Sequence, residues 1–211
     1  GNRPIATGSG MGDNTALVLG SSQVEIAGTN VALPTSVSSP DALRNASHCG
    51  HDLLCVIPSS RWDVDEAAND LHGSPPEVAS RVRHGGFLRN AELFEHSFFS
   101  ISAAEASAMD PQQRQLLERG YGAFHAAGTT KGSLLGSVTA ANVGQWQSEF
   151  GSVLGRTPAG RSVYASTGFS CSVTCGRVSF VLGLHGPCAS YAPACSASLV
   201  GNPGRVRALQ R

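Results

Sequence analysis

The segment from Pro187 to Val200 constrains the fold most strongly, because it reads as a strand, a tight turn and a helix in close succession. The apolar run from Val178 to Leu184 is predicted to form one strand, and a second short strand is predicted just before the turn. The chain then turns through Pro193-Ala194, and small, helix-compatible residues begin at Cys195. This order of elements favours an α/β fold for the C-terminal part of the chain.

Cys195 would lie in the first turn of the predicted helix, where backbone N–H groups are unpaired and the helix dipole is positive. Both features favour the thiolate, which is the form of cysteine that acts as a nucleophile. Cys195 is therefore the candidate catalytic residue. The alternative is a small buried hydrophobic residue, which is the usual role of an isolated cysteine. His185 precedes it in a predicted turn, where both a Cys–His dyad and a solvent-exposed histidine are open.

The residues Ala194–Val200 resemble the Ala-Cys-Ser-Ser-Ser-Leu-Val signature of β-ketoacyl synthases, especially the ketosynthase domains of modular polyketide synthases. Asp110–Glu118 resembles the family's Met-Asp-Pro-Gln-Gln-Arg segment, and Phe94–Ser102 resembles its Phe-Asp-x-x-Phe-Phe-x-Ile-Ser segment. Further similar segments follow in the family's order at Ser39–Leu43, Ile57–Asp63, Gly85–Leu88, Thr167-Gly168, Gly176–Phe180 and Gly183–Pro187. The resemblance extends in register over about residues 24 to 200.

This resemblance implies the N-terminal half of a thiolase-like α/β fold, with a mostly parallel sheet and flanking helices. A ketosynthase accepts an acyl chain from a carrier-protein thioester onto its cysteine, decarboxylates a malonyl-type extender and joins the two by Claisen condensation. By this resemblance, Cys195 is the nucleophile and its backbone N–H is an oxyanion donor. No resident cofactor or metal is expected, since the substrates would arrive on the phosphopantetheine of an acyl carrier protein.

The sequence also departs from the family pattern. The family's condensation chemistry uses two histidines and a lysine from the second half of the fold, and their sequence contexts do not occur among these 211 residues. Pro193 replaces the threonine of the usual Asp-Thr-Ala-Cys, which removes one backbone donor next to Cys195. Gly201–Gly204 is predicted to end the helix after about two turns. The histidines present all precede the cysteine; they are His48, His51, His72, His84, His96, His125 and His185.

Three regions are predicted along the chain. Residues 1–23 are rich in Gly, Ser, Thr and Asn and form an N-terminal arm. Residues 24–200 form the ketosynthase-like domain, and residues 201–211 form a divergent basic tail. Asp110-Pro111 is predicted to begin a helix that runs to Gly128, and Ser39-Pro40 another. Other helices are expected within 145–155 and at 164–176, and strands at 24–27, 135–143, 177–184 and 188–191. An irregular stretch is expected at 57–89; Trp62 is expected to anchor it, and a binding role is the alternative.

Charge and composition exclude several function classes. Lys plus Arg balances Asp plus Glu at 15 each, which argues against binding to nucleic acid or to an anionic membrane. No apolar run approaches the roughly 20 residues that span a bilayer. The six cysteines are irregularly spaced, which favours reduced thiols, and no signal-peptide segment is visible. We therefore expect a cytoplasmic or organellar protein, not a secreted one. Cys171 and Cys175 would share a helix face, where packing is favoured over metal binding.

Half of a thiolase-like fold would expose apolar helix faces, and such a surface indicates an interaction partner. We expect that partner to be a chain carrying the second half, another copy or a large assembly, with an acyl carrier protein in addition if the chain is active. Three functions stay open. The chain is a ketosynthase fragment or subunit that transfers an acyl group to Cys195, a structural or accessory subunit that reuses the fold, or an acyl-binding module.

Overall fold

The computed structural model describes residues 17–19, 22–61, 63–64, 75–146, 148–197 and 199–200. The predicted tail 201–211, Trp62 and most of the predicted arm lie outside these residues. The helices are α1 (Pro40–His48), α3 (Pro76–Arg81), α4 (Ala103–Ala108), α5 (Pro111–Ala126), α6 (Lys131–Leu134), α7 (Phe150–Leu154), α8 (Ala165–Gly168) and α9 (Cys171–Leu182). The strands are β1 (Leu17–Leu19), β2 (Ser22–Val24), β3 (Cys55–Val56), β4 (His84–Gly85), β5 (Ala141–Gly144) and β6 (Cys188–Tyr191), and the 3₁₀ turns are η1 (Pro34–Ser36), η2 (Pro158–Arg161) and η3 (Ala194–Ser196).

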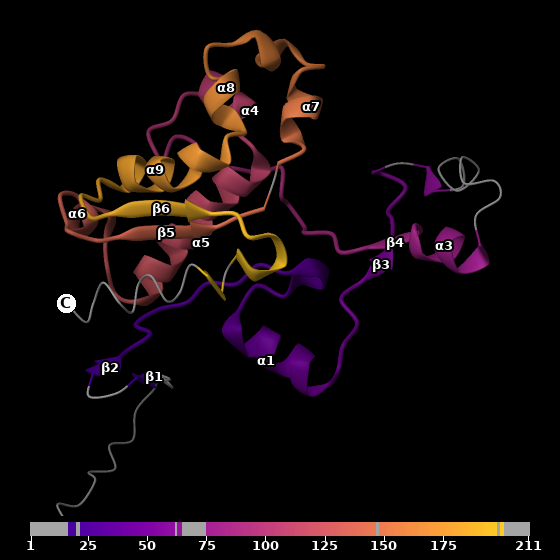
Figure 1. The fold of residues 1–211 in the computed structure, drawn as a ribbon, viewed down its shortest axis with the longest axis horizontal. Coiled ribbons are helices and arrows are strands. Elements are labelled where there is room, and N and C mark those ends of the chain that lie inside the picture. The colour runs from indigo at the N-terminus through magenta and orange to yellow at the C-terminus, as the bar shows by residue number, and fades with distance from the viewer. Residues whose placement is uncertain are drawn as a thin grey trace, which may run out of the picture.

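The parallel pair β5–β6 and the helices beside it form the α/β layer (Figure 1). In the register of this pair, Val143 lies opposite Ser190 and Gly144 opposite Tyr191. The Ser190 hydroxyl accepts a hydrogen bond from the backbone N–H of Cys175 at 3.4 Å, so this side of the pair faces α9. The pairs β1–β2 and β3–β4 are short and antiparallel. The mixture of helix and sheet is that of the expected α/β class.

Helices α1 and α5 begin where the sequence predicts. The Ser39 hydroxyl accepts from the N–H of Ala42 at 3.1 Å, and the Asp110 carboxylate accepts from the N–H of Gln112 at 2.7 Å. In both helices a proline follows the cap, where its missing N–H leaves no intrahelical bond unmade. The capping residue and the proline after it determine where each of these two helices begins, because both act within one turn of the chain.

The strand predicted at 177–184 is wrong, because α9 (Cys171–Leu182) occupies most of that range. A continuous apolar run does not distinguish a buried strand from a buried helix. The structure shows helical spacing instead, since Val178 and Leu182 are both buried one turn apart. Gly183 ends α9 with φ 67°, a left-handed conformation that glycine adopts without a steric cost. The helix predicted at 164–176 is divided between α8 and the first part of α9.

Two other strand predictions are displaced. Of the strand predicted at 24–27, only Val24 is in a strand, as the last residue of β2. The strand predicted at 135–143 begins later, at Ala141, the first residue of β5. Both errors extend the strand into flanking residues, where periodicity alone gives no end signal. The strand predicted at 188–191 is confirmed as β6.

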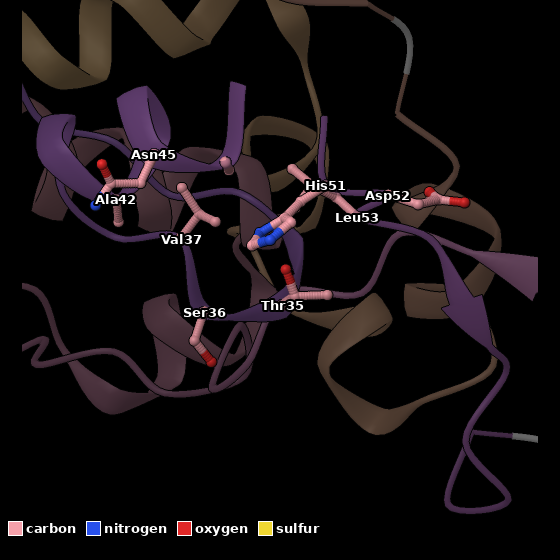
Figure 2. Close-up of a pocket in the computed structure, with 9 residues that line it drawn as sticks. Thr35, Ser36, Val37, Ala42, Asn45, His51, Asp52 and Leu53 are labelled. Atoms are coloured by element: carbon pink, nitrogen blue, oxygen red, sulfur yellow. The ribbon is translucent and has the colours of Figure 1, made fainter. Parts of the chain in front are cut away.

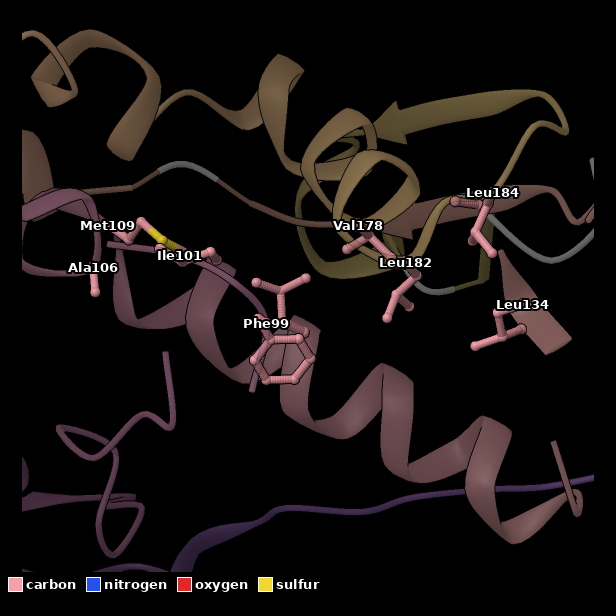
Figure 3. Close-up of a cluster of buried hydrophobic side chains, with 10 residues drawn as sticks. Phe99, Ile101, Ala106, Met109, Leu134, Val178, Leu182 and Leu184 are labelled. Carbon is pink, nitrogen blue, oxygen red and sulfur yellow. The ribbon is translucent and has the colours of Figure 1, made fainter. Parts of the chain in front are cut away.

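The hydrophobic core lies between α5, α9 and the segment that precedes α4 (Figure 3). Met109, Leu117 and Leu182 are almost fully buried there. Each such side chain stabilises the fold by roughly 1.5–3 kcal/mol relative to an exposed position. The core therefore fixes α9, which is the helix that leads into β6.

Buried polar contacts connect the start of α5 with the turn between α8 and α9. The Gln113 side chain donates from Nε2 to the carbonyl oxygens of Thr167 and Ser170 at 3.2 and 3.3 Å. The backbone N–H of Asp110 donates to the carbonyl oxygen of Gly168 at 2.8 Å. These bonds explain why polar residues at the start of α5 are buried. Within the described residues, none of the helices is both long enough and apolar enough to cross a membrane.

Candidate functional site

Cys195 lies four residues beyond the end of β6, in the 3₁₀ turn η3 (Ala194–Ser196). The chain continues into helical conformation at Ala197, which has φ −54° and ψ −47°. The strand, the turn and the helical start therefore occur in the predicted order. The Cys195 side chain is exposed, which excludes the alternative of a buried hydrophobic residue.

Hydrogen bonds hold the segment on both sides of this turn. The carbonyl oxygen of Tyr191 accepts from the backbone N–H of Gln145 at 2.9 Å, which extends the β5–β6 pairing by one bond. The Ser196 hydroxyl donates to the carbonyl oxygen of Pro193 at 3.0 Å. Pro193 caps the 3₁₀ turn without a side-chain hydrogen bond. The first N–H groups of a helical turn have no intrahelical partner, and the N–H of Cys195 is one of these groups.

Ala194 has a φ of 54°, in the left-handed region that a residue with a Cβ rarely adopts. This conformation costs roughly 1–2 kcal/mol for an L-residue. Strained backbone of this kind is concentrated at active sites and ligand clamps. Thr35, Ser36, Asn90 and Ser100 also have positive φ values, but Ala194 is the one of these residues that directly precedes a cysteine.

We expect Ala194→Gly to raise the free energy of unfolding by about 1 kcal/mol, because glycine adopts the left-handed conformation without strain. Ala197→Gly is the matched control, since Ala197 is buried and helical, and it should lower the free energy of unfolding by about 1 kcal/mol. Urea unfolding followed by circular dichroism measures both. Equal losses in the two variants would show that Ala194 is not strained.

His185 does not form the suggested dyad in this arrangement. It lies in the turn between α9 and β6, its side chain is exposed, and its backbone N–H donates to the carbonyl oxygen of Ser137 at 2.8 Å. All six cysteines are free. Cys171 and Cys175 both lie on α9, where Cys175 is buried and the Cys171 thiol donates to the carbonyl oxygen of Trp146 at 3.3 Å. Among the described residues, no three His, Cys, Asp or Glu side chains converge on a metal position.

Two hollows lie elsewhere on the surface, and neither of them was predicted from the sequence. The first, of about 530 Å³, lies between α1 and η1 and is lined by His51, Asn45 and Thr35, among others. Figure 2 shows the His51 ring between α1 and the Thr35 segment. Thr35 and Ser36 have left-handed φ values of 58° and 69°. Glycine is the usual sequence marker of this conformation, and neither position is a glycine, so the sequence did not predict it.

The second hollow, of about 330 Å³, lies at the carboxyl end of β5 against the first half of α5. Gln145 is among its lining residues; the residue is 5% exposed, and its side-chain Nε2 and Oε1 have no hydrogen-bond partner among the described residues. Cys195 does not line either hollow. The sequence predicted only a turn at Gln145, because the burial of this side chain depends on packing against a distant helix.

Comparisons with known proteins agree on one family. The sequence profile described as "Beta-ketoacyl synthase, N-terminal domain" matches residues 21–211. Polyketide synthase GfsB of Streptomyces halstedii is 40% identical over 191 residues, which cover 89% of this chain and 3% of that protein. Pikromycin polyketide synthase component PikAII of Streptomyces venezuelae is 38% identical over 191 residues, which cover 89% of this chain and 5% of that protein.

Solved structures show the same likeness in three dimensions. The ketosynthase from module 6 of the bacillaene synthase of Bacillus subtilis 168 has a TM-score of 0.72 and 28% identity, covering 87% of this chain and 29% of that one. The oxazolomycin ketosynthase domain OzmH KS7 of Streptomyces albus has a TM-score of 0.70 and 25% identity, covering 87% of this chain and 32% of that one. The architecture is therefore thiolase-like, and the chain spans a small part of each relative's length.

Proposed function

Because the chain belongs to the β-ketoacyl synthase family, through its N-terminal domain, we propose that it accepts an acyl group on Cys195 from a thioester. The observation that carries this proposal is the exposed Cys195 thiol in the turn after β6, directly following the strained Ala194. In the transfer, the thiolate attacks the thioester carbonyl carbon and the Cys195 N–H donates to the developing oxyanion. The bond to the donor's sulfur then breaks, and the proton from Cys195 ends on the released thiol.

The donor in this proposal is an acyl thioester on the phosphopantetheine of an acyl carrier protein, in agreement with the resemblance described above, and its thiol is the leaving group. The later condensation needs two histidines and a lysine, which the resemblance assigns to the second half of a thiolase-like fold. We assign that step to the assembly in which these groups meet Cys195. The relatives' names describe polyketide synthases, of which this chain matches 3% and 5% in the two cases given.

Apolar side chains on the surface support a protein partner in that assembly. Val138 and Phe180 are 87% and 88% exposed, and Leu135, which packs beside Gly183 at the end of α9, is 73% exposed. Isolated exposed apolar residues are common, whereas several around one helix end favour an interface. The partner in this proposal is the segment or chain that completes the fold.

Intact mass spectrometry tests the acyl transfer. The folded chain is incubated with a hexanoyl thioester of N-acetylcysteamine and with a hexanoyl-loaded carrier protein. We expect one hexanoyl adduct in the unmodified chain and none in Cys195→Ala. Cys188→Ala is the matched control, because Cys188 is also exposed and lies on the same strand–turn segment, and it should retain the adduct. An adduct that survives in Cys195→Ala, or none in the folded unmodified chain, would contradict the proposal.

A structural or accessory subunit is the second candidate function. It is favoured by Pro193, which occupies the cap of the turn without a side-chain hydrogen bond. The same mass measurement separates the two functions, because a structural subunit forms no adduct specific to Cys195.

A further inference from the structure

Tyr191 is the last residue of β6 and lies four residues before Cys195. Both its backbone and its side chain are bonded to the neighbouring segment of β5. The carbonyl oxygen of Tyr191 accepts from the backbone N–H of Gln145 at 2.9 Å, and the Tyr191 hydroxyl donates to Oδ1 of Asn142 at 3.4 Å. These two bonds restrict the end of the strand and the direction in which the chain leaves it.

The Tyr191 ring has room to reach Asn142 along one face of the β5–β6 pair. Ser190 bonds to α9 on the opposite face, because side chains alternate along a strand. In the register of the pair, Tyr191 lies opposite Gly144, and Ala189 lies opposite Asn142. Gly144 has no side chain and Ala189 has only a methyl group. A tyrosine side chain is long enough to reach a residue two positions back on the neighbouring strand.

The turn after Tyr191 is held by its own bonds in the part of the chain that the structure describes. Ser196 donates to the carbonyl oxygen of Pro193 from its backbone N–H at 3.4 Å and from its hydroxyl at 3.0 Å. The first buried residue after the turn is Ala197, which is 8% exposed. Cys195 therefore lies between two anchored residues, Tyr191 on the sheet and Ala197 in the interior.

We propose that Tyr191 is a positioning residue for Cys195, through the bond between its hydroxyl and Asn142. The hydroxyl acts through the backbone of the turn and not on the thioester, so that it determines where the thiol stands when it attacks. This inference rests on the proposed acylation of Cys195 and adds the residue that directs it. Displacement of a reacting group by about 1 Å can lower a rate by about a hundredfold, so even a smaller shift of the turn has a measurable effect.

Tyr191→Phe tests the proposal in the full chain, because it removes the hydroxyl and keeps the ring. Intact mass spectrometry follows hexanoylation of Cys195 at increasing concentrations of the hexanoyl thioester of N-acetylcysteamine. We expect the rate constant at saturating thioester to fall at least about fivefold. The half-saturating concentration should stay within about twofold, because the hydroxyl does not contribute to thioester binding.

Tyr121→Phe is the matched control. It makes the same chemical change on α5, where the Tyr121 ring packs against Phe98, and it should leave the rate unchanged. A loss that is equal in Tyr121→Phe and Tyr191→Phe would overturn the proposal, as would an unchanged rate in Tyr191→Phe.

The partner residue gives a second test of the same bond. Asn142→Leu removes the oxygen that accepts from the Tyr191 hydroxyl and should slow hexanoylation as Tyr191→Phe does. The double variant should react no more slowly than the slower single variant, because both changes break one bond. Losses that multiply in the double variant would show that the two residues act independently, and would contradict the proposal.

Alkylation by iodoacetamide separates this proposal from the acylation proposal, because it needs the thiol but no thioester. Peptide mapping measures the rate at Cys195 relative to Cys188, which is exposed on the first residue of β6 and serves as the reference within each molecule. The unpaired N–H groups of the turn favour the reactive thiolate only when the turn holds them beside the sulfur. We therefore expect the ratio of the two rates to fall at least about threefold in Tyr191→Phe.

If the unmodified chain forms no hexanoyl adduct but this ratio falls, the acylation proposal fails and the positioning role of Tyr191 stands. A ratio that is unchanged in Tyr191→Phe overturns the positioning role.

Discussion

Replacement of Gly168 by alanine should lower the free energy of unfolding by about 3 kcal/mol, because the new Cβ has no space. Gly168 is buried at the end of α8, and a Cβ there would lie directly against the carbonyl oxygen of Ala108 and 2.8 Å from its carbonyl carbon. Backbone atoms cannot move aside as the end of a flexible side chain can. The same contact region holds the bond from Asp110 N–H to the Gly168 carbonyl, so relief of the clash would also disturb the start of α5.

Gly176→Ala is the matched control for this prediction. Gly176 lies inside α9, and a Cβ there would meet no atom within 4 Å. We expect this variant to raise the free energy of unfolding by about 0.5–1 kcal/mol, because alanine loses less backbone entropy in a helix. Urea unfolding of both variants measures the difference. A loss below about 0.5 kcal/mol for Gly168→Ala would show that α4 and α8 are less closely packed than the structure indicates.

The elements that could be predicted from the sequence are those set by neighbouring residues. Asp110 and Pro111 act within one helical turn, and the strand 188–191 is delimited by Pro187 and by the turn before Cys195. The α9 range could not be predicted in the same way, because a continuous apolar run fits a buried strand as well as a buried helix. Its helical state depends on the core that it shares with α5.

In the candidate site too, the features set by neighbouring residues could be predicted and those set by distant packing could not. The position of Cys195 after a strand and a turn follows from local residues and from the resemblance, and its exposure is in keeping with a nucleophile. The left-handed Ala194 and the unpaired amide of Gln145 could not be predicted. Both depend on how distant parts of the chain pack, and neither residue type suggests its conformation or its environment. The resemblance extended the predictions to chemistry that composition and periodicity do not reveal.

The second large effect is expected at the ion pair between Arg177 and Glu105, which connects α9 with α4. The Arg177 and Glu105 side chains are 8% and 26% exposed, and Arg177 Nε has no hydrogen-bond partner within the part of the chain that the structure describes. Glu105→Gln removes the negative charge and leaves a buried guanidinium without a counter-ion. We expect a loss of about 3 kcal/mol in the free energy of unfolding, since breaking a buried pair from one side costs more than the pair contributes.

Asp41→Asn is the matched control, because it breaks the pair between Asp41 and Arg44, whose side chains are 86% and 58% exposed. Water screens that pair, so we expect a loss of at most about 1 kcal/mol. The double variant Glu105→Leu with Arg177→Met removes both buried charges and should recover most of the stability lost in Glu105→Gln. Urea unfolding measures all three variants.

If Glu105→Gln cost no more than Asp41→Asn, Arg177 would be hydrated in solution and α9 would be held by its apolar contacts alone. Should the larger loss be observed, the pair fixes the helix that precedes β6 and therefore the approach of the chain to Cys195. The negative charge of Glu105 on α4 would then help to position the Cys195 thiol, although the two side chains are not in contact.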